Sequence, residues 1–488
     1  MASPAPVRKD NIGAHWKCLA ACTLMSMCTF QYGVDFGIIG GLQAMKGFLQ
    51  NISPGRQQLI SSLMILGAFI ASSAAGPIAL YLSRRWSIWS ACLLCIVANV
   101  IMMTTDKIGG LYAGRLLIGL ANGLFMTFAQ LYLQECAPAK YRGLTIAAFQ
   151  TWTSLGSLVG TTKKAYIIPL GIVYVIPGIL SIGMLFIPES PRWLLQMDRE
   201  DDARKALKWL RPFPELVDAE LAEMKAAIDA EKLLSVNSEI IDLWRNPIDR
   251  RRTLLGVGAV TLQAASGAMY MISYGTYFFQ MANVGSPFMN SCILTTVGVV
   301  IIIINSCIIT KWGRRRVFLI NGMLICGLCQ LIAIVGVSVL YIMGYNCMVS
   351  SYAWLCGGEF PSQRLRSYTF GLAASVGFFG AWLTTFTAPY FINPDALNWG
   401  PKYGYIWAPS CVIGAIWTYF YLPEVKNRTF EEIDEMFMAK LPARKFRGYK
   451  CVGPAVFAVD EKEGARVSIE EVVWTNPHAV AETMMNVD

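Results

Sequence analysis

The sequence predicts an all-α membrane protein whose twelve transmembrane helices form two pseudo-symmetric bundles of six. Three observations predict this fold class. Of 488 residues, 55% are hydrophobic and only 15% charged, and the mean hydropathy is +0.46, which is more apolar side chain than a soluble core can bury. Apolar runs of about 20 residues, long enough to cross about 30 Å of hydrocarbon, recur along almost the whole chain. Short charged motifs also recur at matching places in its two halves.

The apolar runs are arranged in two groups of six around a charged segment with helical spacing of Leu, Ala and Glu. We therefore expect a tail over 1–17, a first bundle over 18–187, a helical linker over 188–252, a second bundle over 253–422 and a tail over 423–488. The expected spans lie near 18–41, 59–80, 86–103, 111–133, 144–161 and 166–187, and then near 253–279, 290–310, 317–336, 338–358, 368–391 and 405–422.

The net charge of +9 resides in the loops, and alternate loops are basic. This is the positive-inside pattern, and an even number of spans places both termini on the basic side, so we expect both termini in the cytoplasm. The bilayer explains the charge, and no nucleic-acid partner is expected. Residues 1–17 are polar and the first apolar run is long enough to span, so we expect no cleavable signal peptide. We expect a multi-pass protein of the plasma membrane that works as a monomer.

Cysteine and histidine usage argues against a metal centre or a catalytic triad. Most of the 14 Cys residues lie inside apolar runs, where they are expected to serve as small packing residues. The two His residues, His15 and His478, lie near the ends of the chain, so no histidine cluster is available in the core. We therefore expect no metal, no cofactor and no enzymatic activity.

Two motifs carry a family resemblance. Pro188-Glu-Ser-Pro-Arg-Trp-Leu-Leu195 follows the sixth apolar run, and Pro423-Glu-Val-Lys-Asn-Arg-Thr-Phe-Glu-Glu-Ile433 follows the twelfth. With the segment from Glu359 to Arg366, they resemble the sugar porter family of the major facilitator superfamily over about residues 18–437. The resemblance implies a secondary active carrier in which two six-helix bundles alternate access to a sugar site at their interface.

Arginines at the inner ends of the spans recur in register with glutamates, and such charges can close the cytoplasmic side by joining the two bundles. The family's first arginine motif, Asp-Arg-x-Gly-Arg-Arg, is altered here because Leu80 and Ser83 occupy its Asp and Gly positions, so we expect a weaker gate in the first half. The predicted cytoplasmic gate consists of Arg84, Arg85, Glu135, Arg142, Glu189, Arg192, Gly313, Arg314, Arg315, Glu359, Arg364, Glu424 and Arg428.

A carboxylate lies inside the first span, in Gly33-Val-Asp35-Phe-Gly37. An isolated charge there would cost several kcal/mol unless it were paired or protonated. Arg115, which opens the fourth span, is the expected partner, and both positions match the family residues that couple proton movement to sugar movement. A carboxylate beside an arginine can break its ion pair on protonation, so the resemblance implies proton symport with a structural ion pair as the alternative.

A sugar site needs amides for hydroxyl groups and aromatic faces for the C–H side of the ring. The resemblance assigns Gln150, Gln263, Tyr274 and Trp354 to this pocket, together with Trp382, which stands where an eleventh-helix Asn is common. The seventh span departs from the glucose pattern at Ala264 and Met269, among other positions, which removes hydrogen-bonding groups worth on the order of 1 kcal/mol each. Residues 273–279 resemble the fungal α-glucoside (maltose-type) permeases, so an α-glucoside or disaccharide is favoured, with a hexose left open.

Two alternatives stay open. The same fold can serve as a sugar sensor that does not transport, although the tail after Phe437 is short for a signalling module. The connections near 162–165 and 336–340 are shorter than the family's, which fits either minimal external loops or a degenerate carrier whose gene model has lost coding sequence.

Overall fold

The protein is described by a computed structural model in which the placed residues form helices and connecting turns. The structure describes residues 12–43, 54–105, 107–161, 167–234, 241–281, 286–311, 313–332, 337–363, 365–392, 397, 399–449 and 451. No strand occurs within these ranges. The expected fold class is therefore confirmed at the level of secondary structure; of the predicted tails, residues 1–11, 450 and 452–488 lie outside the described residues.

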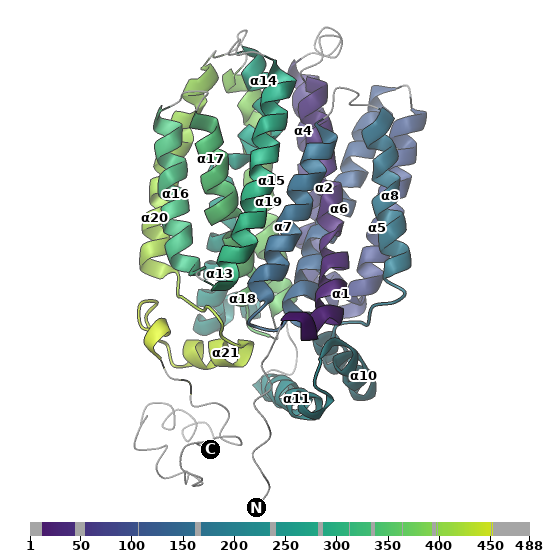
Figure 1. The fold of residues 1–488 in the computed structure, drawn as a ribbon, viewed down its shortest axis with the longest axis vertical. Coiled ribbons are helices and arrows are strands. Elements are labelled where there is room, and N and C mark those ends of the chain that lie inside the picture. Colours follow the sequence, from purple (N-terminus) through teal and green to yellow (C-terminus); the bar gives the residue numbers. More distant parts are fainter. Residues whose placement is uncertain are drawn as a thin grey trace, which may run out of the picture.

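Helices occupy all six expected spans of the first half (Figure 1). The first span follows a short 3-10 turn, η1 (Ile12–His15), and is divided at Met27 into two helices. The sixth ends at Gly183, four residues before its expected end at residue 187, and residues 162–166 before it lie outside the described part of the chain. The helices of this half are α1 (Trp16–Ser26), α2 (Cys28–Gln43), α4 (Pro54–Tyr81), α5 (Arg84–Thr104), α6 (Ile108–Cys136), α7 (Arg142–Gly160) and α8 (Ile167–Gly183).

The second half contains two interrupted spans. Its first helix breaks at Gly267, whose positive φ of 74° is unfavourable for residues with a Cβ. Its fourth contains a π-helical turn, η4, next to the cavity described below. The helices of this half are α13 (Pro247–Ala265), α14 (Ala268–Met281), α15 (Pro287–Lys311), α16 (Arg315–Ile332), α17 (Ser338–Gly344), η4 (Tyr345–Ser350), α18 (Ser351–Glu359), α19 (Arg366–Ile392) and α20 (Gly404–Tyr421), with the 3-10 turn η5 (Gly400–Tyr403) before α20.

Short polar helices gather at one end of the molecule (Figure 1). Ser190 caps the helix Pro191–Gln196 with its hydroxyl, and Thr429 and Glu432 form a capping box on the helix Phe430–Met438. In the linker these elements are α9 (Pro191–Gln196), α10 (Glu200–Leu210), η2 (Pro214–Leu216), α11 (Val217–Leu234) and α12 (Asp242–Arg245), and after the second half they are α21 (Phe430–Met438) and η6 (Phe446–Gly448).

The most extensive contacts between the two halves are those of α2 with α14, α4 with α19 and α7 with α15. In Figure 1 the first half, in purple and blue, stands beside the second half, in green. Seven of the described helices are long and apolar enough to cross a membrane by themselves, α13 and α14 counting as one. Leu93, Ile182 and Ile413 are more than 60% exposed on the outer faces, which fits contact with lipid rather than water.

Candidate functional site: a cavity between the halves and a charged layer at one end

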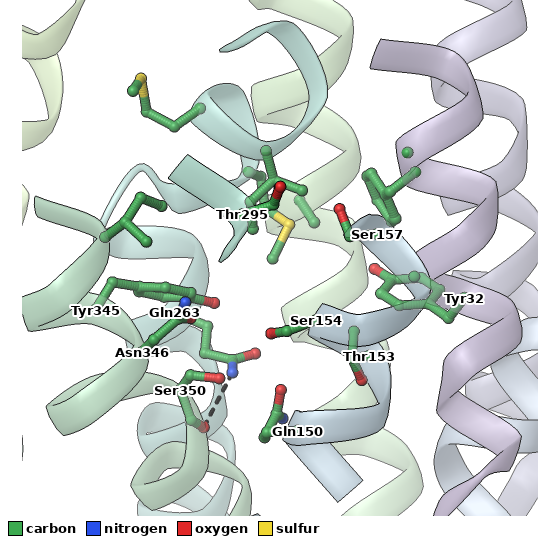
Figure 2. A pocket seen from close by; sticks show the side chains of 18 of the residues that line it. Tyr32, Gln150, Thr153, Ser154, Ser157, Gln263, Thr295, Tyr345, Asn346 and Ser350 are labelled. Atoms are coloured by element: carbon green, nitrogen blue, oxygen red, sulfur yellow. Dashed lines mark hydrogen bonds between the residues drawn. The ribbon is translucent and has the colours of Figure 1, made fainter. Parts of the chain in front are cut away.

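A cavity lies at the interface of the two halves (Figure 2). The first half lines it with α2, α6 and α7, and the second half with α13, α14, α15, the α17–η4–α18 span and α19. Among its lining residues are apolar side chains and several hydrogen-bonding groups, the combination that small-molecule sites use. The polar residues that line it are Tyr32, Gln150, Thr153, Ser154, Ser157, Thr161, Gln263, Thr276, Ser291, Thr295, Tyr345, Asn346 and Ser350.

Two amides from opposite halves point into the cavity. Gln150 is on α7 and Gln263 is on α13, and Figure 2 shows both side chains directed toward its centre. Gln263 Nε2 donates to the carbonyl oxygen of Ser350 at 3.1 Å, whereas Gln150 Nε2 is buried without a partner in the described structure. A buried donor without a partner costs about 1–3 kcal/mol, so this nitrogen is poised to donate to a ligand.

Trp354 lines the cavity from α18 and is 4% exposed. Its ring lies among three phenylalanines, 5.8 Å from Phe370 and 6.3 Å from both Phe149 and Phe378 between centroids. Its carbonyl oxygen accepts a hydrogen bond from Gln130 of α6 at 3.3 Å, which joins the two halves. The structure therefore places Trp354 where its ring can face a ligand.

Tyr274 and Trp382 do not line this cavity. The Tyr274 hydroxyl donates to the carbonyl oxygen of Thr385 at 2.9 Å, and Trp382 stacks on Phe379 and Phe386. The reason is helical phase, because successive residues point about 100° apart. On α14 the cavity-lining residues include Met269, Ile272, Gly275 and Thr276, and on α19 they are Ala374, Gly377, Phe378 and Ala381.

Sequence reasoning missed most of the hydroxyl groups in the cavity. On α7, Thr153, Ser154 and Ser157 follow Gln150 at three, four and seven residues, and this helical stripe could have been found in the sequence. No such signal marks Tyr345 and Asn346, because they belong to the π-helical turn η4, whose extra residue changes the direction of the side chains.

Asp35 is 1% exposed and is held by amides rather than by an arginine. Asn122 Nδ2 donates to Asp35 Oδ2 at 2.6 Å, and Gln31 Nε2 lies 3.4 Å from both carboxylate oxygens. Arg115 is directed elsewhere, since its Nε donates to the carbonyl oxygen of Ile60 at 3.3 Å. Among the described ion pairs none joins Asp35 to Arg115, because Arg115 stands seven residues, or about two helical turns, from Asn122 on α6.

At the end that carries α10, α11 and α21, charged side chains form a layer under the cavity, which we call the charged layer: Arg84, Glu135, Arg142, Arg192, Arg315, Glu359, Arg366 and Glu431. Each half contributes one matching bidentate pair. Arg84 donates to Glu135 at 3.1 and 2.8 Å, and Arg315 donates to Glu359 at the same two distances. All four side chains are almost completely buried. The weaker gate expected in the first half is not seen in this geometry.

Glu189 and Glu424 occupy equivalent places beside this layer. Glu189 accepts the backbone N–H of Arg85 at 3.2 Å at the start of α5, and Glu424 accepts those of Arg315 and Arg316 at 3.3 and 3.2 Å at the start of α16. A carboxylate is favoured at a helix N-terminus. Burial nevertheless raises the pKa of Glu424, although the positive charge of Arg315 acts to lower it. Both glutamates therefore fix the start of a helix.

Several contacts join the two halves within the layer. Arg142 of α7 lies 3.7 Å from Glu359 of α18, and Arg84 donates to the hydroxyl of Ser367 at 3.3 Å. Arg192 of α9 donates to Glu431 of α21 at 2.8 Å and also to Gln363. Burial alone would raise the pKa of Glu431, but the charge of Arg192 and its hydrogen bond lower this pKa to about 2. In this structure these ion pairs and hydrogen bonds hold the layer closed.

Phe430 is an additional member of this contact region that sequence reasoning did not single out. It is 2% exposed, and the guanidinium carbons of Arg366, Arg142 and Arg192 lie 3.6, 3.8 and 4.9 Å from its ring centroid. These arginines come from α19, α7 and α9, and so from both halves and the linker. One aromatic ring thus contacts three cations that would otherwise repel one another.

Other predicted gate residues have different contacts. The Arg85 guanidinium lies over the Trp89 ring at 5.4 Å, and Arg314 is exposed, so Arg315 alone of the second-half pair enters the layer. Arg428 contacts Glu432 at 2.9 Å and the carbonyl oxygen of Tyr449 at 2.7 Å.

Gly313 permits close packing, because a Cβ there would lie 2.5 Å from the Tyr352 hydroxyl. Arg364 lies outside the described residues. Arg366 was missed although it follows Glu359 by seven residues, as Arg142 follows Glu135.

Comparison with known proteins bears on this arrangement. A family model described as "Sugar (and other) transporter" matches residues 21–437. The high glucose sensor RGT2 of Saccharomyces cerevisiae is 29% identical over 84% of this chain and 59% of its own length, so the chain spans less than two thirds of that relative. Maltose permease MAL61 of Saccharomyces cerevisiae is 27% identical over 94% of this chain and 80% of its own length.

Among solved structures, the proton:xylose symporter XylE bound to 6-bromo-6-deoxy-D-glucose superposes with a TM-score of 0.75. The superposition covers 88% of this chain and 100% of that chain at 16% sequence identity. At this identity the likeness shows the fold, which is the major facilitator fold of two six-helix bundles.

Proposed function

The chain belongs to the sugar transporter family, and on that premise we propose that it is a proton-coupled sugar carrier working by alternating access. The observation that carries the proposal is the cavity between the halves, into which Gln150 and Gln263 both point and where the Gln150 amide nitrogen has no partner among the described residues. A carrier needs a site that both halves complete, so that their movement exposes it to one side and then the other. The charged layer then closes one end of this site.

The cargo we propose is an α-glucoside or a hexose. Hydroxyl and amide groups surround the cavity, and Trp354 and Tyr345 offer aromatic faces. The similarity to maltose permease MAL61 supports the disaccharide. The family favours carrier function over catalysis. Within the described ranges, no three His, Cys, Asp or Glu side chains converge into a metal site.

We place the charged layer on the cytoplasmic side, with both termini there, and the protein in the plasma membrane as a monomer. The basic loops support this orientation, since Lys and Arg are retained on the cytoplasmic side. We propose two bundles over 18–187 and 253–422 around a linker over 188–252. Helices α9 to α11 of that linker have their own apolar cluster, which includes Trp193, Leu207 and Val217.

Asp35 is the proposed proton-binding residue because it is a buried carboxylate at a junction of α2 and α6. We expect Asp35→Asn to abolish accumulation of labelled maltose or glucose against a gradient in proteoliposomes, while exchange of sugar at equal concentrations continues. Asp198→Asn, which changes an exposed carboxylate of the linker, is the matched control and should accumulate normally. Accumulation by Asp35→Asn at the wild-type level would refute the proton assignment.

A second candidate is a sugar sensor that does not transport, and the similarity to the high glucose sensor RGT2 favours it. Uptake in transporter-null cells separates the two. A sensor would change transcription in response to sugar without flux. A degenerate carrier would show neither, and sequencing the transcript across residues 161–165 and 336–340 would test for lost coding sequence.

A further inference from the structure

The first half contains two helix pairs held together by glycines. Helices α2 and α7 approach so closely that a Cβ on Gly33 would lie 1.9 Å from the carbonyl oxygen of Thr153. Helices α4 and α6 do the same, because a Cβ on Gly119 would lie 2.1 Å from the carbonyl oxygen of Met64. Each pair is therefore packed backbone against backbone and is expected to move as one unit.

The hydrogen bond between Asp35 and Asn122 crosses the boundary between these pairs. Asp35 and Gln31 are on α2 of one pair, and Asn122 is on α6 of the other. The Asn122 contact, at 2.6 Å, is the shorter, whereas Gln31 lies 3.4 Å away on the same helix as Asp35. All three residues are buried, so this polar contact is shielded from water.

Both amides have an unused acceptor. Gln31 Oε1 and Asn122 Oδ1 are buried without a hydrogen-bond partner in the described structure. An amide side chain exchanges its N–H donor for its oxygen acceptor by turning through 180°. The ionised carboxylate accepts N–H bonds, and a protonated carboxyl can donate its O–H to the same amide after such a turn. The two amides can thus satisfy both protonation states of Asp35.

Few other ionisable groups act on this carboxylate. Arg115 of α6 interacts with it electrostatically without touching it, and the thiol of Cys95 on α5 also interacts with its charge. The groups that act most strongly on the Asp35 carboxylate are Arg115, Asn122 and Gln31. The groups in contact are the two amides, so they decide which protonation state fits the packed helices.

We propose that Asn122, assisted by Gln31, is the positioning residue that couples protonation of Asp35 to the junction between the α2–α7 and α4–α6 pairs. The inference rests on the proposed function, because it gives the mechanism by which Asp35 would act. In the ionised state the N–H of Asn122 ties the two pairs together. Protonation of Asp35 removes the negative charge that accepts this hydrogen bond. The Asn122 amide must then turn to accept the carboxyl O–H, and this neutral hydrogen bond ties the two helix pairs together less strongly.

The junction connects directly to the cavity. Tyr32 stands three residues before Asp35 on α2, lines the cavity, and lies 6.0 Å from Phe378 of α19 between ring centroids (Figure 2). Met126 stands four residues after Asn122 on α6 and also lines the cavity. A change at the junction therefore reaches the sugar through both helices, and through Tyr32 it reaches the second half.

The test is the pH dependence of maltose or glucose uptake by the full chain in proteoliposomes. Asn122→Val removes the donor that stabilises the carboxylate, so the carboxyl keeps its proton to higher pH. We expect the pH of half-maximal uptake to rise by about one pH unit, a tenfold change in the protonation equilibrium. Gln31→Leu should give a smaller rise because its contact is longer. Equilibrium exchange, which requires no net proton movement, should be retained.

Two further variants keep the test decisive. Asn122→Asp preserves volume and places a second carboxyl against Asp35, so the pair should share a proton and the midpoint should also rise. Thr127→Val removes a buried hydroxyl of α6 that bonds Ser72 at 3.0 Å, and its midpoint should stay at the wild-type value. A wild-type midpoint in both Asn122 variants, with exchange intact, would overturn the inference alone. Wild-type uptake without any response to pH would overturn the proposed coupling itself, and the inference with it.

Discussion

The charged layer and the cavity share several helices and are organised in opposite ways. Helix α7 carries Arg142 into the layer and Gln150 into the cavity, and α18 carries Glu359 and Trp354 in the same way. In the layer the glutamates contact arginines at 2.8 to 3.7 Å. In the cavity the Gln150 amide nitrogen has no partner among the described residues. In a closed gate the charged groups pair with one another, whereas in an empty binding site some polar groups stay unpaired until the ligand binds.

Glu359→Gln should have the largest effect, because Glu359 contacts both Arg315 and Arg142. Removing one partner from a buried ion pair typically costs 3–5 kcal/mol, so we expect the closed layer to lose most of its population, with transport reduced roughly 100-fold. The layer should then admit water to Cys356, which is buried three residues earlier on α18. Labelling by a membrane-impermeant thiol reagent, followed by peptide mass spectrometry, measures this exposure.

Arg314→Gln is the matched control for that variant, since Arg314 is exposed next to Arg315. It should transport and label like the wild type. If Cys356 in Glu359→Gln stayed as protected as in the wild type, the layer would not be the barrier on this side, and the contrast with the cavity would fail.

Gln150→Ala should have an intermediate effect confined to binding. The amide nitrogen is expected to donate to a sugar hydroxyl, and one such hydrogen bond is worth about 1–2 kcal/mol, so KM should rise about 5- to 30-fold. Initial rates over a range of sugar concentrations measure it. Tyr274→Phe removes the hydroxyl that bonds Thr385 outside the cavity, and its KM should not change. Equal KM values for the two variants would mean that the cavity is not the sugar site.

Mild acid should have the smallest effect on the layer. The pKa of Glu431 is lowered to about 2, so the Arg192–Glu431 pair contributes fully above the ordinary glutamate value near 4.5 and is lost as the pH falls toward 2. We expect the difference in Tm between wild type and Glu431→Gln to stay constant from pH 7 to pH 5. A difference in Tm that disappeared by pH 5 would show that this pair titrates in the pH range of the protons that drive transport. The charged layer and the proton-binding residue would then not respond to pH independently.

Much of the charged layer could be predicted because charge pairs leave a signal in the sequence. Arg84, Glu135, Arg142, Arg315 and Glu359 recur at the inner ends of apolar runs, and charged residues there must find partners. Arg366 carried the same signal, seven residues after Glu359. The contact of Phe430 with three arginines left none, because those arginines lie far apart in the chain.

The sequence alone determined the fold class and the helical spans, because bilayer thickness and backbone hydrogen bonding allow few arrangements of long apolar runs. Its short charged motifs, rather than its hydropathy, indicated the family. Only the tertiary structure decided which polar groups meet. Helical phase turned Tyr274 and Trp382 out of the cavity, the π-helical turn brought in Tyr345 and Asn346, and the glycine-packed helix pairs set Asp35 against Asn122 rather than Arg115. Such contacts depend on a few ångströms of packing between distant segments, which hydropathy and motif spacing do not encode.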